Sequence, residues 1–388
     1  MRLYGLALLF LVPGIALGLD VGDLDLQIHG TVAQGGLLSS HNNYLTAKTS
    51  DGSTQWTEAA LNAATSVSDN LRIGLQLHTY RLGELGKLKL DVDWAYGDYR
   101  IREWFGIRAG KVKTPLGLCN DTQDIDTLHL WALLPQGVYP ADNRSWTLAH
   151  TGGDVYSKVR LPGRLGKLSY QGYFGSRTAD SDGGYFKAAA EAGFSVADGA
   201  FGRLYGGDVR WHTPLRGLTT GSSVGMADAS GHLSIVNEPF PLTLKSTSDT
   251  NTAMYAEFEQ GKFYAAGEYR RRIWNLAIPE MRLQAVAQDT RAWYLMAAYR
   301  IHPKVNLGAY CSRYRYAALK AFGNPSEPAR LYSNDWVTAI RIDPNPYLYF
   351  KFEAHYIDGT AGGFYVSTNP TGFDRLTRLV VARIGFTF

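Results

Sequence analysis

The sequence predicts an all-β protein, a transmembrane antiparallel up-and-down β-barrel of about 16 strands. The last nine residues, Val380 to Phe388, carry apolar side chains at every second position and place Arg383 on the opposite face, as in a strand that meets lipid on one side and water on the other. The composition agrees, because aromatic residues reach 13%, glycines number 42 and charged residues make up only 19%. Beyond the first residues no run of 18 apolar residues occurs, so the chain lacks a transmembrane helix.

Alternation of apolar and polar residues predicts the individual strands, each near or above the roughly 9–11 residues that a tilted strand needs to cross a bilayer. They are expected at 25–37, 55–68, 70–80, 87–97, 101–113, 151–161, 166–176, 201–212, 217–228, 250–260, 262–274, 290–301, 304–316, 333–343, 346–358 and 376–388. In the strand at 87–97, the side chains expected to face lipid are Leu88, Leu90, Val92, Trp94 and Tyr96.

The connections between these strands alternate between short and long, as an up-and-down barrel requires. Tight turns, such as 97–100, are expected on the periplasmic side, and long loops, such as 229–249 and 275–289, on the external side. The third external connection, 114–150, is the longest, and we expect it to fold into the pore.

The two ends of the chain indicate its compartment. Residues 1–18 have the short apolar run and small-residue cleavage site of a secretory signal, which leaves 19–388 as one barrel domain in the outer membrane of a Gram-negative-type cell. The terminal aromatics, Phe386 and Phe388, are expected to act as an assembly signal for the barrel-assembly machinery. The two cysteines, Cys119 and Cys311, provide no disulfide framework.

A barrel of this size is wide enough to hold an aqueous channel, whose selectivity depends on the charges at its narrowest point. The third connection is acidic, whereas the wall positions that alternation assigns to the lumen are mainly basic. We therefore expect a constriction in which an acidic loop faces a basic wall, although many of these charges could instead pair along neighbouring strands. The candidate pore-lining residues are Arg108, Lys111, Lys113, Asp121, Asp124, Asp126, Arg144, Lys158, Arg160, Arg210, Arg270 and Arg272.

Tryptophans near strand ends are expected to form girdles at the membrane interfaces or to lie in subunit contacts. The candidates are Trp104, Trp211, Trp274, Trp293 and Trp336.

The stretch Gly110-Lys111-Val112-Lys113-Thr114-Pro115-Leu116-Gly117-Leu118-Cys119-Asn120-Asp121 resembles the opening of the third loop in the phosphate-selective porin O and P type family. Similar stretches begin at Trp94, Leu133 and Thr213. The resemblance covers most of 19–388 and implies a homotrimer of sixteen-stranded barrels with diffusive solute flow. Lys111, Cys119 and Asp121 depart from the usual pattern, and no lysine ladder for phosphate is evident, so the family name does not identify the solute.

Two other classes of protein compete with a channel. An outer-membrane enzyme would need a site, and the one G-x-S-x-G match, Gly221 to Gly225, lies inside a predicted strand instead of a strand–turn–helix elbow. The histidines form no zinc pattern. A secreted β-sandwich would explain the strands but not their apolar outward faces.

The sequence therefore favours an outer-membrane porin for passive diffusion of small hydrophilic solutes and ions, with a weak preference for anions, and not an enzyme. The alternative within the same class is a channel selective for phosphate, another oxyanion or a sugar. Expected partners are outer-membrane lipid and small polar solutes or anions, with no cofactor and no metal. A net charge of +4 over 388 residues is too small to indicate nucleic-acid binding.

Overall fold

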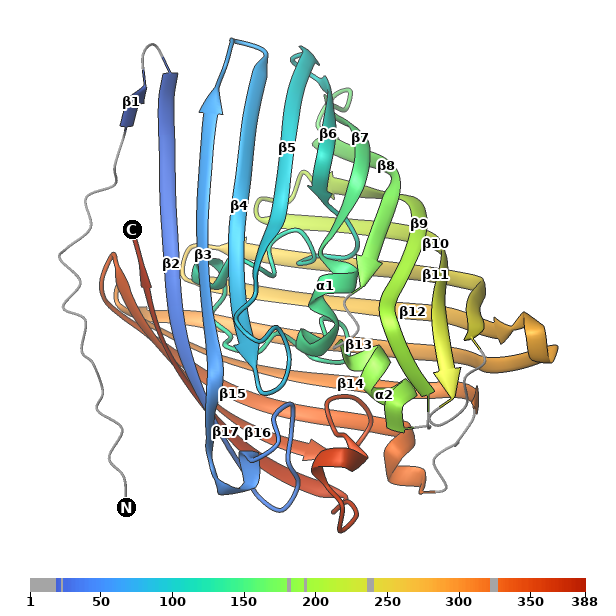
Figure 1. Ribbon diagram of the computed structural model, residues 1–388. Coiled ribbons are helices and arrows are strands. Elements are labelled where there is room, and N and C mark those ends of the chain that lie inside the picture. The colour runs from blue at the N-terminus through green and yellow to red at the C-terminus, as the bar shows by residue number, and fades with distance from the viewer. Residues whose placement is uncertain (1–18, 22–23, 180–182, 192–193, 236–240, 322–326) are drawn as a thin grey trace.

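Sixteen strands, β2 to β17, form one closed antiparallel barrel in the computed structural model (Figure 1), which describes residues 19–21, 24–179, 183–191, 194–235, 241–321 and 327–388. Consecutive strands pair throughout, and β17 pairs with β2 to close the ring. All sixteen expected strands are confirmed. The predicted signal peptide, 1–18, lies outside the described residues.

The barrel strands are β2 Leu24–Ser39, β3 Ser53–Ser66, β4 Leu71–Leu82, β5 Leu90–Arg102, β6 Phe105–Lys113, β7 Ala149–Arg160, β8 Lys167–Ala179, β9 Phe194–His212, β10 Leu218–Ile235, β11 Pro241–Gln260, β12 Phe263–Ile278, β13 Leu283–His302, β14 Val305–Ala321, β15 Tyr332–Asn345, β16 Leu348–Asp358 and β17 Leu376–Thr387. A short strand, β1 Leu19–Val21, pairs with the start of β2.

The predicted alternation of faces is confirmed in β17. Val380 and Ile384 are 53% and 43% exposed, whereas Val381 and Arg383 are buried. The same apolar exposure recurs around the ring, for example at Phe174 on β8. Side chains of this kind are stable outside a barrel only against lipid or another apolar surface.

In β5 the predicted faces are right up to Asp93, which faces inward, and wrong beyond it. A β-bulge at Asp93 makes Gln76 pair with Trp94 while the next residue, Leu77, pairs with Val92. One extra residue reverses the parity of the strand, so Trp94 and Tyr96 point inward. The strand also runs on to Arg102, so the turn expected at 97–100 lies at 103–104 instead.

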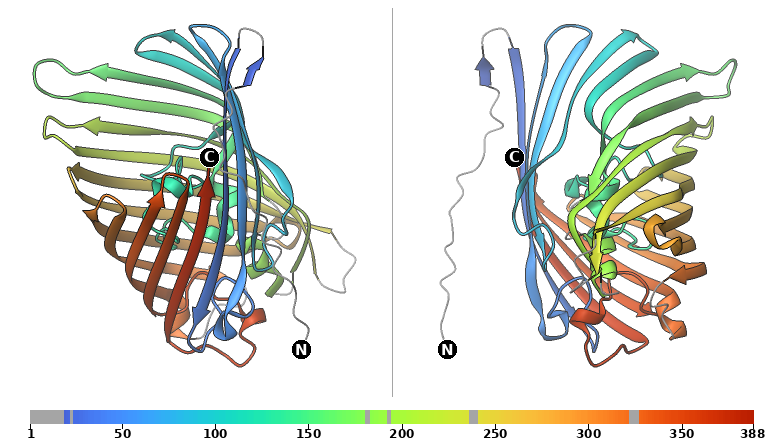
Figure 2. Two further views of the ribbon diagram at one scale, coloured as in Figure 1. Left: turned by 90° about the vertical axis from the view of Figure 1, so that its left-hand side faces the viewer. Right: turned by 45° about the vertical axis from the view of Figure 1, so that its right-hand side comes forward.

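The strands β9 to β14 are longer than predicted, with up to 20 residues each. The expected loop 229–249 is therefore mostly strand, with only residues 236–240 between β10 and β11. The expected loop 275–289 is likewise reduced to 279–282, between β12 and β13. Figure 2 shows the barrel from two further sides, with its strands tilted against one another.

Helical structure is confined to the loops. In the described residues the α-helices are α1 Arg144–Thr147 and α2 Gly184–Glu191. The 3-10 turns are η1 Thr49–Asp51, η2 Asp126–Leu128, η3 Ala141–Asn143, η4 Pro279–Met281, η5 Pro328–Leu331 and η6 Val366–Thr368, and η2 and η3 share one connection with α1. Among the described residues, none of these helices has the length and apolar character needed to cross a membrane.

Glycines opposite aromatic residues let rings lie flat against the strands. A Cβ on Gly221 would lie 2.3 Å from the Tyr255 ring, which belongs to its partner in the β10–β11 register. At the seam, the Phe388 ring covers Gly30 in the same way, and the backbone N–H of Phe388 donates to the Gly30 carbonyl (3.0 Å). The last residue of the chain thus helps to close the ring.

Candidate pore lining

The third long connection, residues 114–148 between β6 and β7, packs against inward-facing side chains on two sides of the barrel. One apolar cluster joins it to β11–β15 and a second joins it to β2–β4, β16 and β17. Trp131 stands edge-on to Tyr310 on β14, with ring centroids 5.0 Å apart. The connection is therefore anchored across the barrel by burial of apolar surface.

Asp126, in η2, is held by two cations of the wall. Lys351 Nζ donates to its carboxylate (2.7 Å), Arg383 Nε lies 3.2 Å from it, and the Tyr349 hydroxyl also donates to it. Burial alone would raise the pKa of Asp126, but Arg383 and Lys351 outweigh it and hold this pKa below the usual value. The Lys351 side chain is fully buried and that of Asp126 keeps 15% of its surface exposed, so little of this charge cluster reaches water.

A second chain of polar contacts joins the start and end of the connection to β5. Lys113 Nζ donates to Asp124 (2.8 Å), and the Gln76 amide donates to both Asp124 (3.0 Å) and Asp93 (2.9 Å). Arg144, in α1, completes the chain by donating to Asp93 (3.0 Å). The bulge in β5 places Trp94 on the inner face beside Asp93.

On the side of the barrel opposite β5, side chains of β12 hydrogen-bond to the backbone of the third connection. Arg270, on β12, donates to the carbonyls of Val138 (2.7 Å) and Leu116 (3.0 Å) and also pairs with Glu268 (3.1 Å). Glu268 in turn accepts from the Leu118 amide (3.2 Å). Arg270 therefore fixes the position of the third connection.

Several charges that remain open to water lie on β6 to β9, and Glu257 and Glu259 on β11 add two carboxylates to the same inner face. Arg210, on β9, pairs with Asp208 (2.9 Å) and lies 3.5 Å from Asp121 of the connection. The exposed fraction of the side chain is 24% for Arg210 and 34% for Asp121, and Arg108, paired with Asp98 (2.9 Å), is 29% exposed. These exposed fractions are higher than those of Asp126 (15%) and Lys351 (0%).

Lys158 and Arg160, on β7, continue this open face towards the short turns. Register places Lys158 in one row with Ser169 and Arg210, and places Arg160 opposite Lys167. Both are exposed, and in the described part of the chain neither forms an ion pair. They supply positive charge that no carboxylate neutralises locally.

Two of the predicted site residues lie elsewhere. Lys111 shares the outward parity of Ile107 and Ala109, and its Nζ donates to the Val92 carbonyl at the surface. Arg272 lies further along β12 than Arg270 and pairs with Asp249 (2.8 Å). Neither residue is therefore part of the proposed constriction.

Alternation missed other members of the charge clusters, above all Glu58 on β3. Glu58 pairs with Arg383 and with His78, whose Nε2 lies 2.9 Å away. The sequence offered one sign of this role, because Glu58 is the one carboxylate in a strand rich in alanine. The two cysteines are free, with Cys119 buried in the connection and Cys311 half-buried on β14. Among the described residues no group of three potential metal ligands occurs.

No family model matches the chain, and no curated protein matches it. Solved structures do resemble it. OmpT, an outer-membrane protein of Vibrio cholerae, has a TM-score of 0.59 at 10% identity over 95% of this chain and 99% of its own. The outer-membrane channel DcaP of Acinetobacter baumannii has a TM-score of 0.55 at 11% identity over 94% and 97%, and the anion-selective porin from Comamonas acidovorans has 0.55 at 11% over 94% and 100%.

The chain therefore has the sixteen-stranded barrel fold of the outer-membrane porins. At these identities the likeness concerns the fold alone. The finer resemblance to the phosphate-selective O and P type family stays a prediction.

Proposed function

We propose that this protein is an outer-membrane porin that conducts small hydrophilic solutes and ions passively, with a weak preference for anions. The observation that carries the proposal is the contrast between the two faces of the strand ring. Outside, large apolar side chains are exposed around the ring, whereas inside, along β6 to β9, charged side chains keep contact with water. A closed sheet with these two faces separates lipid from an aqueous path.

The third connection is the proposed constriction. The sequence predicted that its acidic residues face a basic wall across water, but two of them contact bases directly. Asp124 and Asp126 are in direct contact with bases and act mainly to pin the loop. Asp121 beside Arg210 is the pair that remains partly exposed. The proposed path runs between this pair and the β6–β8 wall.

The proposed anion preference rests on the basic residues of the β7–β8 wall. Arg108 and Arg210 each have a carboxylate partner, but Lys158, Arg160 and Lys167 stand on the inner face beside them without one in the described residues. Unpaired positive charge in a narrow polar passage raises the local concentration of anions.

The proposal places the mature chain, 19–388, in the outer membrane after removal of a signal peptide and assigns it no catalytic role. We also propose a homotrimer, which the likeness in fold supports, because one similar structure, OmpT of Vibrio cholerae, is described as a trimer form. A phosphate- or sugar-selective channel is the alternative within this class.

The test is ion selectivity in planar bilayers after refolding in detergent. The double variant Lys158→Glu/Arg160→Glu should shift the reversal potential in a salt gradient towards cations, because it inverts the unpaired charge. The matched control is Lys111→Glu, on the outer face, which should leave the reversal potential unchanged. A barrel that conducts no ions would overturn the porin proposal, and an unchanged potential in the double variant would remove these residues from the path.

A further inference from the structure

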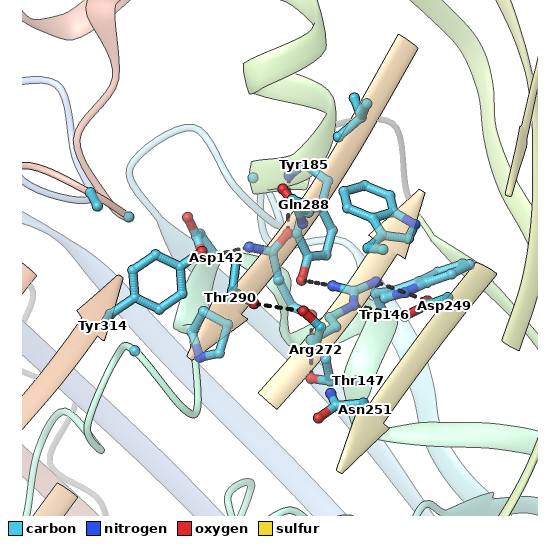
Figure 3. A pocket seen from close by; sticks show the side chains of 18 of the residues that line it. Asp142, Trp146, Thr147, Tyr185, Asp249, Asn251, Arg272, Gln288, Thr290 and Tyr314 are labelled. Carbon is cyan, nitrogen blue, oxygen red and sulfur yellow. Dashed lines mark hydrogen bonds and ion pairs between the residues drawn. The ribbon is translucent and has the colours of Figure 1, made fainter. Parts of the chain in front are cut away.

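A second feature of the interior is a chamber of about 530 Å³ above the proposed constriction. It lies between the loop helices α1 and α2 and the inner faces of β8 and β11 to β14 (Figure 3). The residues proposed above for ion selectivity, Lys158 and Arg160, are not among those that line it.

Two arginines share one carboxylate in the wall of this chamber. Arg272, on β12, binds Asp249 through two N–H groups (2.8 and 2.9 Å), and Arg177, on β8, reaches the same carboxylate (3.3 Å). Asp249 is buried, whereas the side chains of Arg272 and Arg177 keep 11% and 12% of their surface exposed. The triad therefore carries a surplus of one positive charge at the edge of the cavity.

The two guanidinium groups also retain free donors. Two guanidinium groups carry ten N–H groups. Arg272 uses three, two for Asp249 and one for the Tyr185 hydroxyl, and Arg177 uses two, for Asp249 and the Trp146 carbonyl. Arg177 Nε has no hydrogen-bond partner in the described part of the chain. An incoming carboxylate would find both charge and donors here.

Aromatic rings surround the same triad. The Arg177 guanidinium lies 4.0 Å from the centre of the Trp146 ring, and that of Arg272 lies 4.7 Å from Trp274 and 5.1 Å from Tyr185. On the far side of the cavity Tyr314, on β14, adds another ring (Figure 3). The chamber is thus an aromatic cavity with a cationic patch.

Trp274 was expected to belong to an interfacial girdle, but it points into this cavity. The other candidates, Trp104, Trp211, Trp293 and Trp336, are 36–52% exposed. Its ring centre lies 5.2 Å from that of Tyr185, on the wall of the cavity. A planar ligand could therefore stack along this aromatic wall.

We propose that this chamber binds aromatic monocarboxylates, with the carboxylate at Arg177 and Arg272 and the ring against Trp274 and Tyr185. The proposal rests on the channel function above, because the chamber would be a stage on the solute path. A ligand with a carboxylate but no ring would contact only the two arginines of the triad. A ligand with a ring but no charge would contact only the aromatic side chains. A neutral sugar would gain nothing from the surplus charge.

The experiment uses the refolded full barrel in detergent and measures binding by calorimetry. Benzoate is the probe, and acetate, benzyl alcohol and glucose are the comparison solutes. We expect benzoate to bind most tightly of the four. Arg177→Gln should weaken benzoate binding about tenfold, the scale of one charge-assisted contact, while the bidentate pair of Arg272 with Asp249 keeps the wall intact. Arg177→Lys should restore part of the loss.

Two controls make the result decisive. Arg203→Gln removes an arginine of the outer face, which pairs with Asp228 in an exposed position, and should leave benzoate binding unchanged. Trp274→Ala should weaken benzoate but not acetate. If benzoate binds no better than acetate, benzyl alcohol or glucose to a barrel that conducts ions in bilayers, the inference is wrong and the porin proposal stands. Absence of conductance would overturn the porin proposal, and calorimetry would still decide the inference.

Discussion

At the scale of single residues, buried charges hold the third connection in place. Asp126 is the most consequential, because it neutralises Lys351, which has no contact with solvent, and also pairs with Arg383. Removing one partner of a buried ion pair destabilises a protein by much more than the intact pair stabilised it, because the other charge is left buried and unpaired. The interior of this barrel therefore depends on a few carboxylates from one loop.

Asp126→Asn should destabilise the barrel by about 3–5 kcal/mol, because it removes the carboxylate that both Lys351 and Arg383 contact. The measurement is the temperature at which the folded form loses its distinct mobility on a denaturing gel. Asp228→Asn, which affects only the exposed pair with Arg203, is the control and should not shift this temperature. An equal shift in both variants would contradict the special role of Asp126.

The same contact predicts a pH dependence. The pKa of Asp126 is lower in the folded protein than its usual value of 3.8, so its contribution to stability is fully present above pH 3.8 and is lost as the pH falls towards the folded pKa. The gel-shift temperature of the native protein should therefore decrease more steeply below pH 3.8 than that of Asp126→Asn. Parallel pH profiles for the two proteins would show that another group controls the acid transition.

At the scale of elements, the bulge in β5 and the glycine–aromatic pairs shape the wall. The bulge brings Trp94 to the inner face beside Asp93. On β10, Gly221 lets the Tyr255 ring lie flat, and from there the Tyr255 hydroxyl donates to Asp208 (2.7 Å). Asp208 in turn orients Arg210 (2.9 Å), so a glycine with no chemistry of its own positions the charges of the proposed path.

Gly221→Ala should destabilise the barrel by about 1–3 kcal/mol, because the added Cβ would overlap the Tyr255 ring and force it to move. The displaced ring would release Asp208, so the single-channel conductance should change as well. Gly97→Ala is the matched control, since a Cβ there would meet nothing closer than 4.0 Å. Normal stability of Gly221→Ala would show that the ring has another position of equal energy.

At the scale of the whole molecule, the chain closes on itself through its last residues. Nine residues of β17 pair with β2, from Leu379 to Thr387, and Phe388 adds two backbone hydrogen bonds to Gly30. The sequence predicts that the assembly machinery recognises Phe388, and the structure adds a contact in the seam. The predicted recognition would come before folding, whereas the seam contact forms on folding.

Phe388→Ala separates these two roles. We expect a several-fold loss of folded barrel in the outer membrane of cells, because the recognition signal is removed, with a smaller effect on refolding in detergent, where only the contact with Gly30 is lost. The measurements are the amount of heat-modifiable barrel in outer-membrane fractions and the refolding yield. Phe373→Ala, in the last loop, is the control. Equal losses in cells and in detergent would assign Phe388 to the seam alone.

Much of the barrel could be predicted from sequence because the period of a strand is local. Alternation in β17 identified its two faces, and sixteen such segments predicted the closed ring. The prediction failed where one residue changed the parity, at Asp93, and where strands β10 to β13 continued into regions that lack a clear apolar face. In both places the pairing with neighbouring strands, not the local pattern, determines the structure.

By itself, the sequence determined the number of strands, the lipid-facing side of most of them and the length of the connection between β6 and β7, since each of these depends on residues close together in the chain. Only the tertiary structure decided which charges meet. Asp126 and Lys351 are 225 residues apart, and Arg177, Asp249 and Arg272 come from three strands that no local pattern relates. Ring closure brings such residues together, because it makes every strand a neighbour of the same interior.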